Sequence, residues 1–246
     1  MPVIDKTSPI PYYQQLAELL RREIGEKQAE DAVYQLPSES ELTERHGLSR
    51  ATVRHALDEL EREGWIYRQK GVGSFAPVRR VQQELTQLVS TTEYMRQRGW
   101  SLITRVVGLG QVPATPHVAH ALEIAAGAPV YQLCRLRIVD DVPVSLQTAY
   151  LPAELCPRLE DNDLTSSLYR LLETRYAQRL WTGREVLRAR GAAHEEARLL
   201  QIREGVPVMY AERITCASTG TPIEYLEAVW RGDRYDFTVT LTRPAT

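Results

Sequence analysis

The chain has little of the residues and segments that mark the more specialised classes of protein. Only three of its 246 residues are cysteines, and Cys134, Cys156 and Cys216 are too widely spaced for a metal or redox motif. A sparse, odd set of this kind predicts reduced thiols rather than a disulfide framework. No apolar run approaches the roughly 20 residues that a membrane-spanning helix needs, and no signal peptide opens the chain. These absences predict a cytoplasmic protein without a membrane partner.

Catalytic and cofactor motifs are missing as well. The five histidines form no zinc-binding pattern, and the sequence contains no Ser-His-Asp or phosphate-loop pattern. The glycine pairs at 71–73 and 108–110 lack the third glycine and the flanking units of nucleotide-binding motifs. We therefore expect no catalytic residues, no metal site and no cofactor.

A strong basic charge, which often marks a nucleic-acid partner, is also absent. The chain carries 30 Lys and Arg residues against 32 Asp and Glu residues, a net charge of −2. Residues 1–80 hold 12 basic and 13 acidic residues, so any attraction to DNA must come from a local patch. The length and composition are those of a globular chain with one large or two ordinary domains.

What the sequence does contain is a strong pattern between residues 36 and 76. Ser38 and, three residues later, Glu41 form a capping-box pattern that starts a helix. We expect this helix to run to about Arg45. It should end at Gly47, because glycine accepts the left-handed backbone of a tight turn.

A second helix and a hairpin follow within the same stretch. Ser49 caps the second helix, whose apolar side chains recur at helical spacing. Two short strands, at 65–68 and 74–76, surround a glycine-rich turn at 71–73. This order predicts a winged helix-turn-helix, whose second helix enters the major groove of DNA. An amphipathic helix around residues 10–24 is expected to pack on these two helices.

The second helix carries side chains that suit DNA binding. Arg50 and Arg54 are four residues apart and share one face, and an arginine can bind a guanine edge or a phosphate. Hydroxyls can donate to phosphates, and a bare backbone at the hairpin tip can enter a minor groove. The predicted DNA-contacting residues are Ser38, Ser40, Ser49, Arg50, Thr52, Arg54, His55, Lys70 and Gly71. The alternative is an ordinary helical hairpin with solvated arginines.

The same run resembles the DNA-binding domain of the GntR transcription regulators, which has the form LPSEREL, then SRxTVRxAL, then EGxxxRxxGxGTF. The match covers residues 36–42, 49–57 and 63–75. At Ser40 the family commonly has an arginine that touches DNA, so the resemblance implies an altered contact there. Two such units related by symmetry would read a palindromic double-stranded operator.

Beyond the hairpin, the pattern changes to that of an α+β domain. We divide the chain into a winged helix-turn-helix domain at 1–77, a polar linker at 78–84 and a second domain at 85–246. Two long hairpins, at 130–150 and 206–230, predict a mostly antiparallel sheet with helices on one side.

The second domain resembles the UTRA effector domain of the HutC-type branch of GntR regulators, which is similar in fold to chorismate lyase. The matching segments are STTEYMRQRG at 90–99, GAPVYQLCRLRIVDDVPVSLQTAYLP at 127–152, TSSLYRLLE at 165–173, EEARLLQIREGVPVMYAERI at 195–214 and TPIEYLEAVWRGDRYDFTVTL at 221–241. The resemblance implies that this domain binds a small molecule. In sugar-phosphate-responsive members, these regions gather around a phosphate or carboxylate. Gln147 stands where sugar-binding members often have a glutamate.

Two arginines make an anion the expected effector. Arg135 and Arg137 are two residues apart on a predicted strand and share a face, where they would repel unless an anion or carboxylates satisfied them. Hydroxyl groups lie near two predicted helix starts, which favour anions. The predicted effector-binding residues are Ser90, Thr91, Thr92, Arg135, Arg137, Gln147, Ser166, Ser167, Glu224 and Trp230. The alternative is that the arginines pair with Glu224, Glu227 or Glu212 and the hydroxyls merely cap helices.

Together these patterns predict a homodimeric, cytoplasmic transcription regulator. We expect a repressor whose operator affinity is controlled by a small anionic metabolite, a sugar phosphate or a related acid. An architectural DNA-binding protein without an effector is one alternative, and a pocket that binds nothing would favour it. A lyase-like enzyme is the other, and the missing catalytic motifs count against it.

Overall fold

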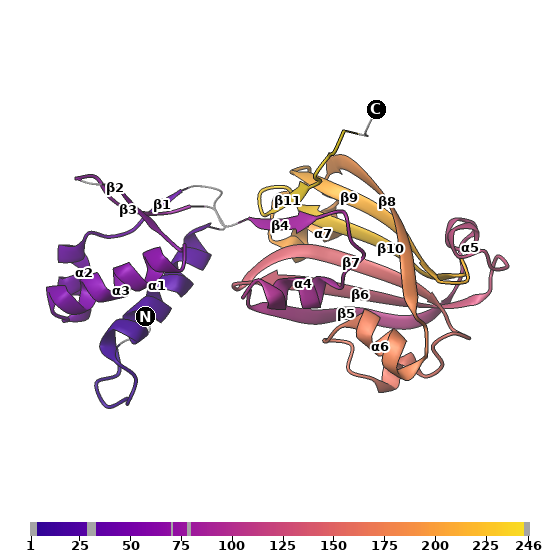
Figure 1. Cartoon of the computed structure of the whole chain (residues 1–246), viewed down its shortest axis with the longest axis horizontal. Helices are drawn as coiled ribbons and strands as arrows, with labels where there is room; N and C mark the ends of the chain where they lie inside the picture. The colour runs from indigo at the N-terminus through magenta and orange to yellow at the C-terminus, as the bar shows by residue number, and fades with distance from the viewer. Residues whose placement is uncertain (1–3, 29–32, 70, 78–79, 244–246) are drawn as a thin grey trace. The chain divides into compact units, whose positions relative to one another are not determined.

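The computed structural model divides the chain into two compact units, Met1–Arg80 and Val81–Thr246 (Figure 1). The described residues are 4–28, 33–69, 71–77 and 80–243. Lys70, which was predicted to contact DNA, lies outside the described residues, as do the first two residues of the predicted linker. Over the described ranges, no helix has both the length and the apolar character needed to cross a lipid bilayer.

Three helices make up most of the first unit, because each has one apolar stripe to bury. They are α1 (Tyr12–Gln28), α2 (Glu39–His46) and α3 (Arg50–Arg62). Their apolar side chains meet in a single core, in which Leu16 and Leu57 are buried. The predictions of these three helices are confirmed.

Short-range contacts fix the turn between α2 and α3. The Ser38 hydroxyl accepts a hydrogen bond from the Glu41 amide at 3.3 Å, and the Glu41 carboxylate accepts one from the Ser38 amide at 2.7 Å. This completes the predicted capping box. Gly47 closes α2 with a φ of 63°, which glycine adopts without strain. The Ser49 hydroxyl accepts a hydrogen bond from the Thr52 amide at 3.1 Å and caps α3.

A small antiparallel sheet in the order β1-β3-β2 completes the first unit. Its strands are β1 (Tyr34–Gln35), β2 (Tyr67–Gln69) and β3 (Gly73–Ala76). The β2–β3 hairpin is the predicted wing. The sequence did not predict β1, because a two-residue strand leaves no periodic pattern.

A six-stranded antiparallel sheet in the order β5-β6-β7-β10-β9-β8 forms the centre of the second unit. Its strands are β5 (Leu102–Pro113), β6 (Pro129–Val139), β7 (Val142–Pro152), β8 (Leu180–Gly191), β9 (Pro207–Ala217) and β10 (Pro222–Arg231). The two predicted hairpins are β6–β7 and β9–β10, and they meet through β7 and β10. The prediction of a mostly antiparallel sheet is confirmed.

Helices pack on both faces of this sheet, whereas the sequence predicted them on one side. One face is covered by α4 (Thr91–Gln97) and α6 (Leu168–Arg175), with a 3-10 turn at Leu159–Asp161. The other face is covered by α5 (Pro116–Leu122) and α7 (His194–Leu200). The central strands β6 and β7 are therefore buried on both faces, as their nearly continuous apolar runs indicate.

The linker prediction was wrong for part of its range. Residues Val81–Glu84 form strand β4, which pairs in parallel with β11 (Tyr235–Thr238). Val81 and Gln83 are buried in this strand. Its short polar sequence gave no clear apolar period, and its partner lies near the other end of the chain. The second unit therefore begins directly after Arg80.

Candidate DNA interface and effector site

The helix predicted to read DNA, α3, presents its basic side chains to solvent. Arg50 is exposed and has no polar partner among the described residues, so its guanidinium is free to contact another molecule. Arg54 is also exposed and forms an ion pair with Glu39 at 3.1 Å. Exposed ion pairs are weak, so Arg54 can leave Glu39 for a DNA group with little loss of free energy.

Other predicted DNA contacts already have partners inside the first unit. The hydroxyls of Ser38 and Ser49 cap helices, and the Thr52 hydroxyl lies 2.8 Å from that of Ser49. The Ser38 hydroxyl donates its proton to Glu41, and one of the Ser49 and Thr52 hydroxyls donates to the other, so only one of these three keeps a proton for a phosphate. The His55 ring stacks on Tyr13 of α1 with the ring centroids 3.8 Å apart, so this side chain is held against α1.

The wing is fixed to α3 by an arginine that the sequence did not indicate. Arg68 of β2 forms an ion pair with Asp58 at 2.8 Å and donates to the backbone oxygen of Arg54 at 3.4 Å. Gly71 is exposed near the wing tip with a φ of 77°, and Ser40 is exposed near the start of α2. No local spacing reveals Arg68, because its partners lie in another element.

In the second unit, the sheet buries both arginines of β6. Arg135 is 4% exposed and Arg137 is 2% exposed. No carboxylate of a described residue lies within 4.0 Å of either guanidinium. Burial lowers the pKa of Arg135 to about 10, and burial together with the charge of Arg135 lowers the pKa of Arg137. The Glu224 carboxylate lines the same cavity and partly offsets both shifts, but it lies beyond ion-pair distance. Buried charges without a close partner are costly, so the two guanidinium groups suit a further anion.

Neutral groups surround Arg137. Its Nη1 donates to the hydroxyl of Thr104 at 2.6 Å and to that of Thr92 at 3.3 Å. Its Nε donates to Gln147 Oε1 at 3.0 Å, and the amide nitrogen of Gln147 donates to the Thr91 hydroxyl at 3.5 Å. Thr91 and Thr92, at the start of α4, therefore contact Gln147 and Arg137 of the sheet, as the predicted site requires.

Arg135 makes fewer hydrogen bonds than it can. Its Nη1 donates to the Ser166 backbone oxygen at 3.3 Å, whereas its buried Nε has no partner. The Ser166 hydroxyl bonds instead to the backbone oxygen of Asp163. The hydroxyls of Ser90 and Ser167, at the starts of α4 and α6, lie 2.9 Å apart. The hydroxyl-bearing residues predicted at the two helix starts are thus in contact through Ser90 and Ser167. Ser166 contributes its backbone carbonyl oxygen, which accepts from Arg135.

Glu224 of β10 faces the same place. It is 2% exposed and accepts hydrogen bonds from the hydroxyls of Tyr169 and Thr215, each at 3.1 Å. The sequence did not indicate Thr104, Tyr169 or Thr215. The alternation of side chains along a strand gives the face on which Thr104 or Thr215 lies. It does not give the order of the strands in the sheet, which places these threonines near the arginines.

These side chains line a cavity of about 20 Å³, room for little more than one water molecule. Arg135, Arg137, Gln147, Ser90, Thr91 and Glu224 all contribute to its lining. Pockets for small molecules commonly measure about 300–1,000 Å³. A small molecule bound here would have to open the cavity or extend beyond it.

Trp230, also predicted to bind the effector, does not line this cavity. It is 2% exposed and packs in the main core, with its ring centroid 5.1 Å from that of Phe237. Trp230 pairs with Ser145 of β7, which pairs with Arg137 of β6, so Trp230 lies in the same row of the sheet as Arg137, two strands away. Its contact with a ligand stays a prediction.

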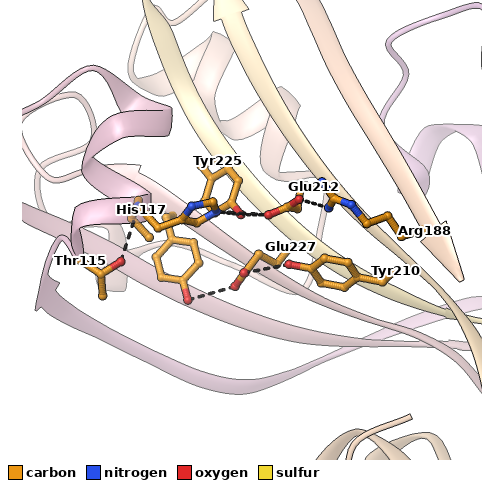
Figure 2. Close-up of polar contacts among 9 residues, drawn as sticks. Thr115, His117, Arg188, Tyr210, Glu212, Tyr225 and Glu227 are labelled. Carbon is orange, nitrogen blue, oxygen red and sulfur yellow. Dashed lines mark hydrogen bonds and ion pairs between the residues drawn. The ribbon is translucent and has the colours of Figure 1, made fainter. Parts of the chain in front are cut away.

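Two carboxylates considered as partners for the arginines lie on the opposite face of the sheet. Figure 2 shows Glu212 beside Tyr225, and Glu227 beside Tyr210. The Tyr225 hydroxyl donates to Glu212 at 2.9 Å, and the Tyr210 hydroxyl donates to Glu227 at 3.0 Å. Side chains alternate along a strand, so Tyr225 and Glu227 point away from the face that carries Glu224. Neither Glu212 nor Glu227 serves as counter-ion for the arginines.

A winged helix-turn-helix joined to an α+β domain with a buried polar cavity is the architecture of one class of protein, the ligand-responsive transcription regulators. The chain belongs to the GntR family, in the branch that carries a UTRA domain. The model for "Bacterial regulatory proteins, gntR family" matches residues 12–76, and the UTRA domain model matches residues 97–236. The protein is a DNA-binding transcription regulator and not an enzyme.

Several relatives are similar over most of the chain. The HTH-type transcriptional repressor NagR of Bacillus subtilis (strain 168) is 36% identical over 236 residues, which cover 95% of this chain and 96% of NagR. The histidine utilization repressor of Pseudomonas aeruginosa is 30% identical, over 84% of this chain and 82% of its own. The crystal structure of PhnF from Mycobacterium smegmatis is 27% identical, with a TM-score of 0.67, and the match covers 91% of this chain and 99% of PhnF.

Proposed function

We propose that the protein is a homodimeric repressor whose operator affinity is set by a small anionic metabolite bound at Arg135 and Arg137. The observation that carries this proposal is the pair of buried guanidinium groups without a carboxylate partner. A phosphate or carboxylate would accept charge-assisted hydrogen bonds from both groups. The names of relatives such as NagR and the histidine utilization repressor support repression as the sign of regulation.

Two hydrogen bonds of α4 support coupling between this site and the start of the second unit. Thr92 of α4 accepts a hydrogen bond from Arg137, and Tyr94 of the same helix donates one to the backbone oxygen of Gln82 in β4. An anion that replaces Thr92 at the guanidinium would shift α4 and, through Tyr94, β4. Because β4 follows the DNA-binding unit in the chain, its shift would change the spacing of two DNA-binding units in a dimer.

Binding of an anion to the purified protein tests this function. Phosphorylated sugars and small carboxylic acids are screened for those that raise the melting temperature, since a ligand specific to the native state stabilises it. The active compound should then weaken operator binding roughly five- to 150-fold, the range of a coupling of about 1–3 kcal/mol. A protein that binds its operator but responds to none of these anions would instead be an architectural DNA-binding protein.

We expect the second unit to hold the homodimer. Two winged domains related by a two-fold axis would contact two half-sites of a palindromic operator. Sedimentation of the full chain should give twice its 28.0 kDa mass, and a chain that begins at residue 78 should also be dimeric at micromolar concentration. The control is a chain of residues 1–80, which should be monomeric. A monomeric second unit would contradict this expectation.

A further inference from the structure

The wing and α3 belong to the same DNA-binding unit, but the wing is anchored in its core only at its base. Ile66 and Ala76, at the two ends of the β2–β3 hairpin, are 3% and 0% exposed. The strand β3 also pairs with β1, whereas β2 lies at the edge of this small sheet. The contacts that hold β2 against α3 therefore decide the direction in which the wing projects.

Arg68 of β2 contacts three residues of α3. Its Nη1 lies 2.8 Å from Asp58 Oδ1, and its Nε lies 3.5 Å from Glu61 Oε2. Its Nη2 donates to the backbone oxygen of Arg54 at 3.4 Å. The backbone amide of Arg68 also donates to Glu61 Oε1 at 3.2 Å, so α3 holds both the side chain and the backbone of this residue.

These three residues follow one another along one face of α3. Asp58 is four residues after Arg54, and Glu61 is three residues after Asp58, which are the spacings of neighbours on a helix surface. Arg54 carries the exposed guanidinium predicted to contact DNA. A lysine could offset the charge of the two carboxylates, but only a planar guanidinium binds several acceptors in fixed directions. The geometry of this contact, and not only its charge, therefore depends on arginine.

We propose that Arg68 is a positioning residue for operator recognition, which fixes the wing relative to α3. Gly71 at the wing tip and Arg54 on α3 then meet the minor and the major groove of the same DNA together. When two contacts are rigidly linked, the second forms within the complex and less entropy is lost on binding. Only the operator offers both contacts in the matching register, so Arg68 contributes to specificity without touching DNA. This inference is independent of the effector.

Arg68→Lys tests the inference, because it keeps the charge and removes the geometry. The probes are the duplex that the wild-type protein enriches from a random-sequence library and an unselected duplex of the same length. Dissociation constants are measured at one fixed salt concentration, and hydroxyl-radical cleavage of the DNA reports the wing in the minor groove. Full-length Asp58→Asn is the second variant. Full-length Arg62→Lys is the control, since Arg62 pairs with Glu59 within α3.

We expect Arg68→Lys to bind the selected duplex about tenfold more weakly than wild type, to bind the unselected duplex as wild type does, and to lose the minor-groove protection. Asp58→Asn should bind the unselected duplex more tightly, because it removes a negative charge near DNA. It should nevertheless lose minor-groove protection and have a lower ratio of selected to unselected affinity. Arg62→Lys should behave as wild type.

The positioning role is overturned if Arg68→Lys keeps the wild-type affinity ratio and the minor-groove protection. It is also overturned if Arg68→Lys weakens binding to both duplexes by the same factor, or if the wild-type complex shows no minor-groove protection. Melting temperatures check the fold, and if Arg68→Lys melts below wild type, the affinity ratio and the protection of Asp58→Asn decide in its place.

Discussion

Replacing Arg135 and Arg137 together by methionine is expected to abolish the response of operator binding to the effector. Each guanidinium should contribute about 1.5–3 kcal/mol through charged hydrogen bonds, or roughly tenfold to 150-fold in effector affinity. Operator affinity without effector should stay at the wild-type value, because the arginines lie in the second unit. The measurement is an operator titration at fixed salt, with and without the effector. A double variant that responds with unchanged effector affinity would place the effector site elsewhere.

The same double substitution is expected to raise the free energy of unfolding. Burial lowers the pKa of Arg135 from its ordinary value to about 10, so folding disfavours its charged form at neutral pH. A basic group whose pKa is lower in the folded state is destabilising below about pH 10, and this destabilisation fades as the pH rises above that value. Methionine has no charge to desolvate, so it removes the destabilisation at pH 7.

Arg231 supplies the matched control for this stability effect. It is also 2% exposed, but it forms an ion pair with Asp233. Arg231→Met should lower the free energy of unfolding, because it leaves a partly buried carboxylate without this partner. Denaturant unfolding at pH 7 compares the two variants. The anion-site interpretation of Arg135 and Arg137 would be wrong if their replacement destabilised the fold as much as that of Arg231.

Arg50→Ala is expected to weaken operator binding roughly tenfold to more than a hundredfold. One good base contact contributes about 1–3 kcal/mol of discrimination, and Arg50 is exposed near the start of α3 without another polar partner among the described residues. The matched control is Arg62→Ala at the other end of the same helix, where Arg62 pairs with Glu59. Binding is measured at fixed salt, because phosphate contacts depend on ionic strength.

The control should bind its operator nearly as tightly as wild type, which separates a specific contact from a general loss of positive charge. Both variants must keep the helical content and melting temperature of the wild type. If folded Arg50→Ala bound normally, α3 would not be the element that reads DNA.

The first unit could be predicted almost completely from the sequence, because short-range chemistry decides it. Ser38 and Ser49 accept hydrogen bonds from amides three residues away, and Gly47 supplies the left-handed turn between the two helices. Such signals lie within one turn of the residues that they position. The strand β1 escaped prediction because it forms only by pairing with β3, far along the chain.

The effector site could be predicted only in part, because strand order brings its residues together. Two-residue spacing placed Arg135 and Arg137 on one face, and the structure confirms that face. No local pattern indicates that Thr215 of β9 lies near Tyr169 of α6, since tertiary packing decides this contact.

The central claim is that the anion site and the operator site share one coupling free energy, and reciprocity tests it most directly. The effector dissociation constant is measured for the free protein and for the operator-bound protein. Linkage requires the operator to weaken effector binding by the same factor as the effector weakens operator binding, roughly five- to 150-fold. Tyr94→Phe, which removes the hydrogen bond between α4 and β4, should leave effector binding to the free protein unchanged and reduce that factor. Equal effector affinity for the free and operator-bound proteins would contradict the claim.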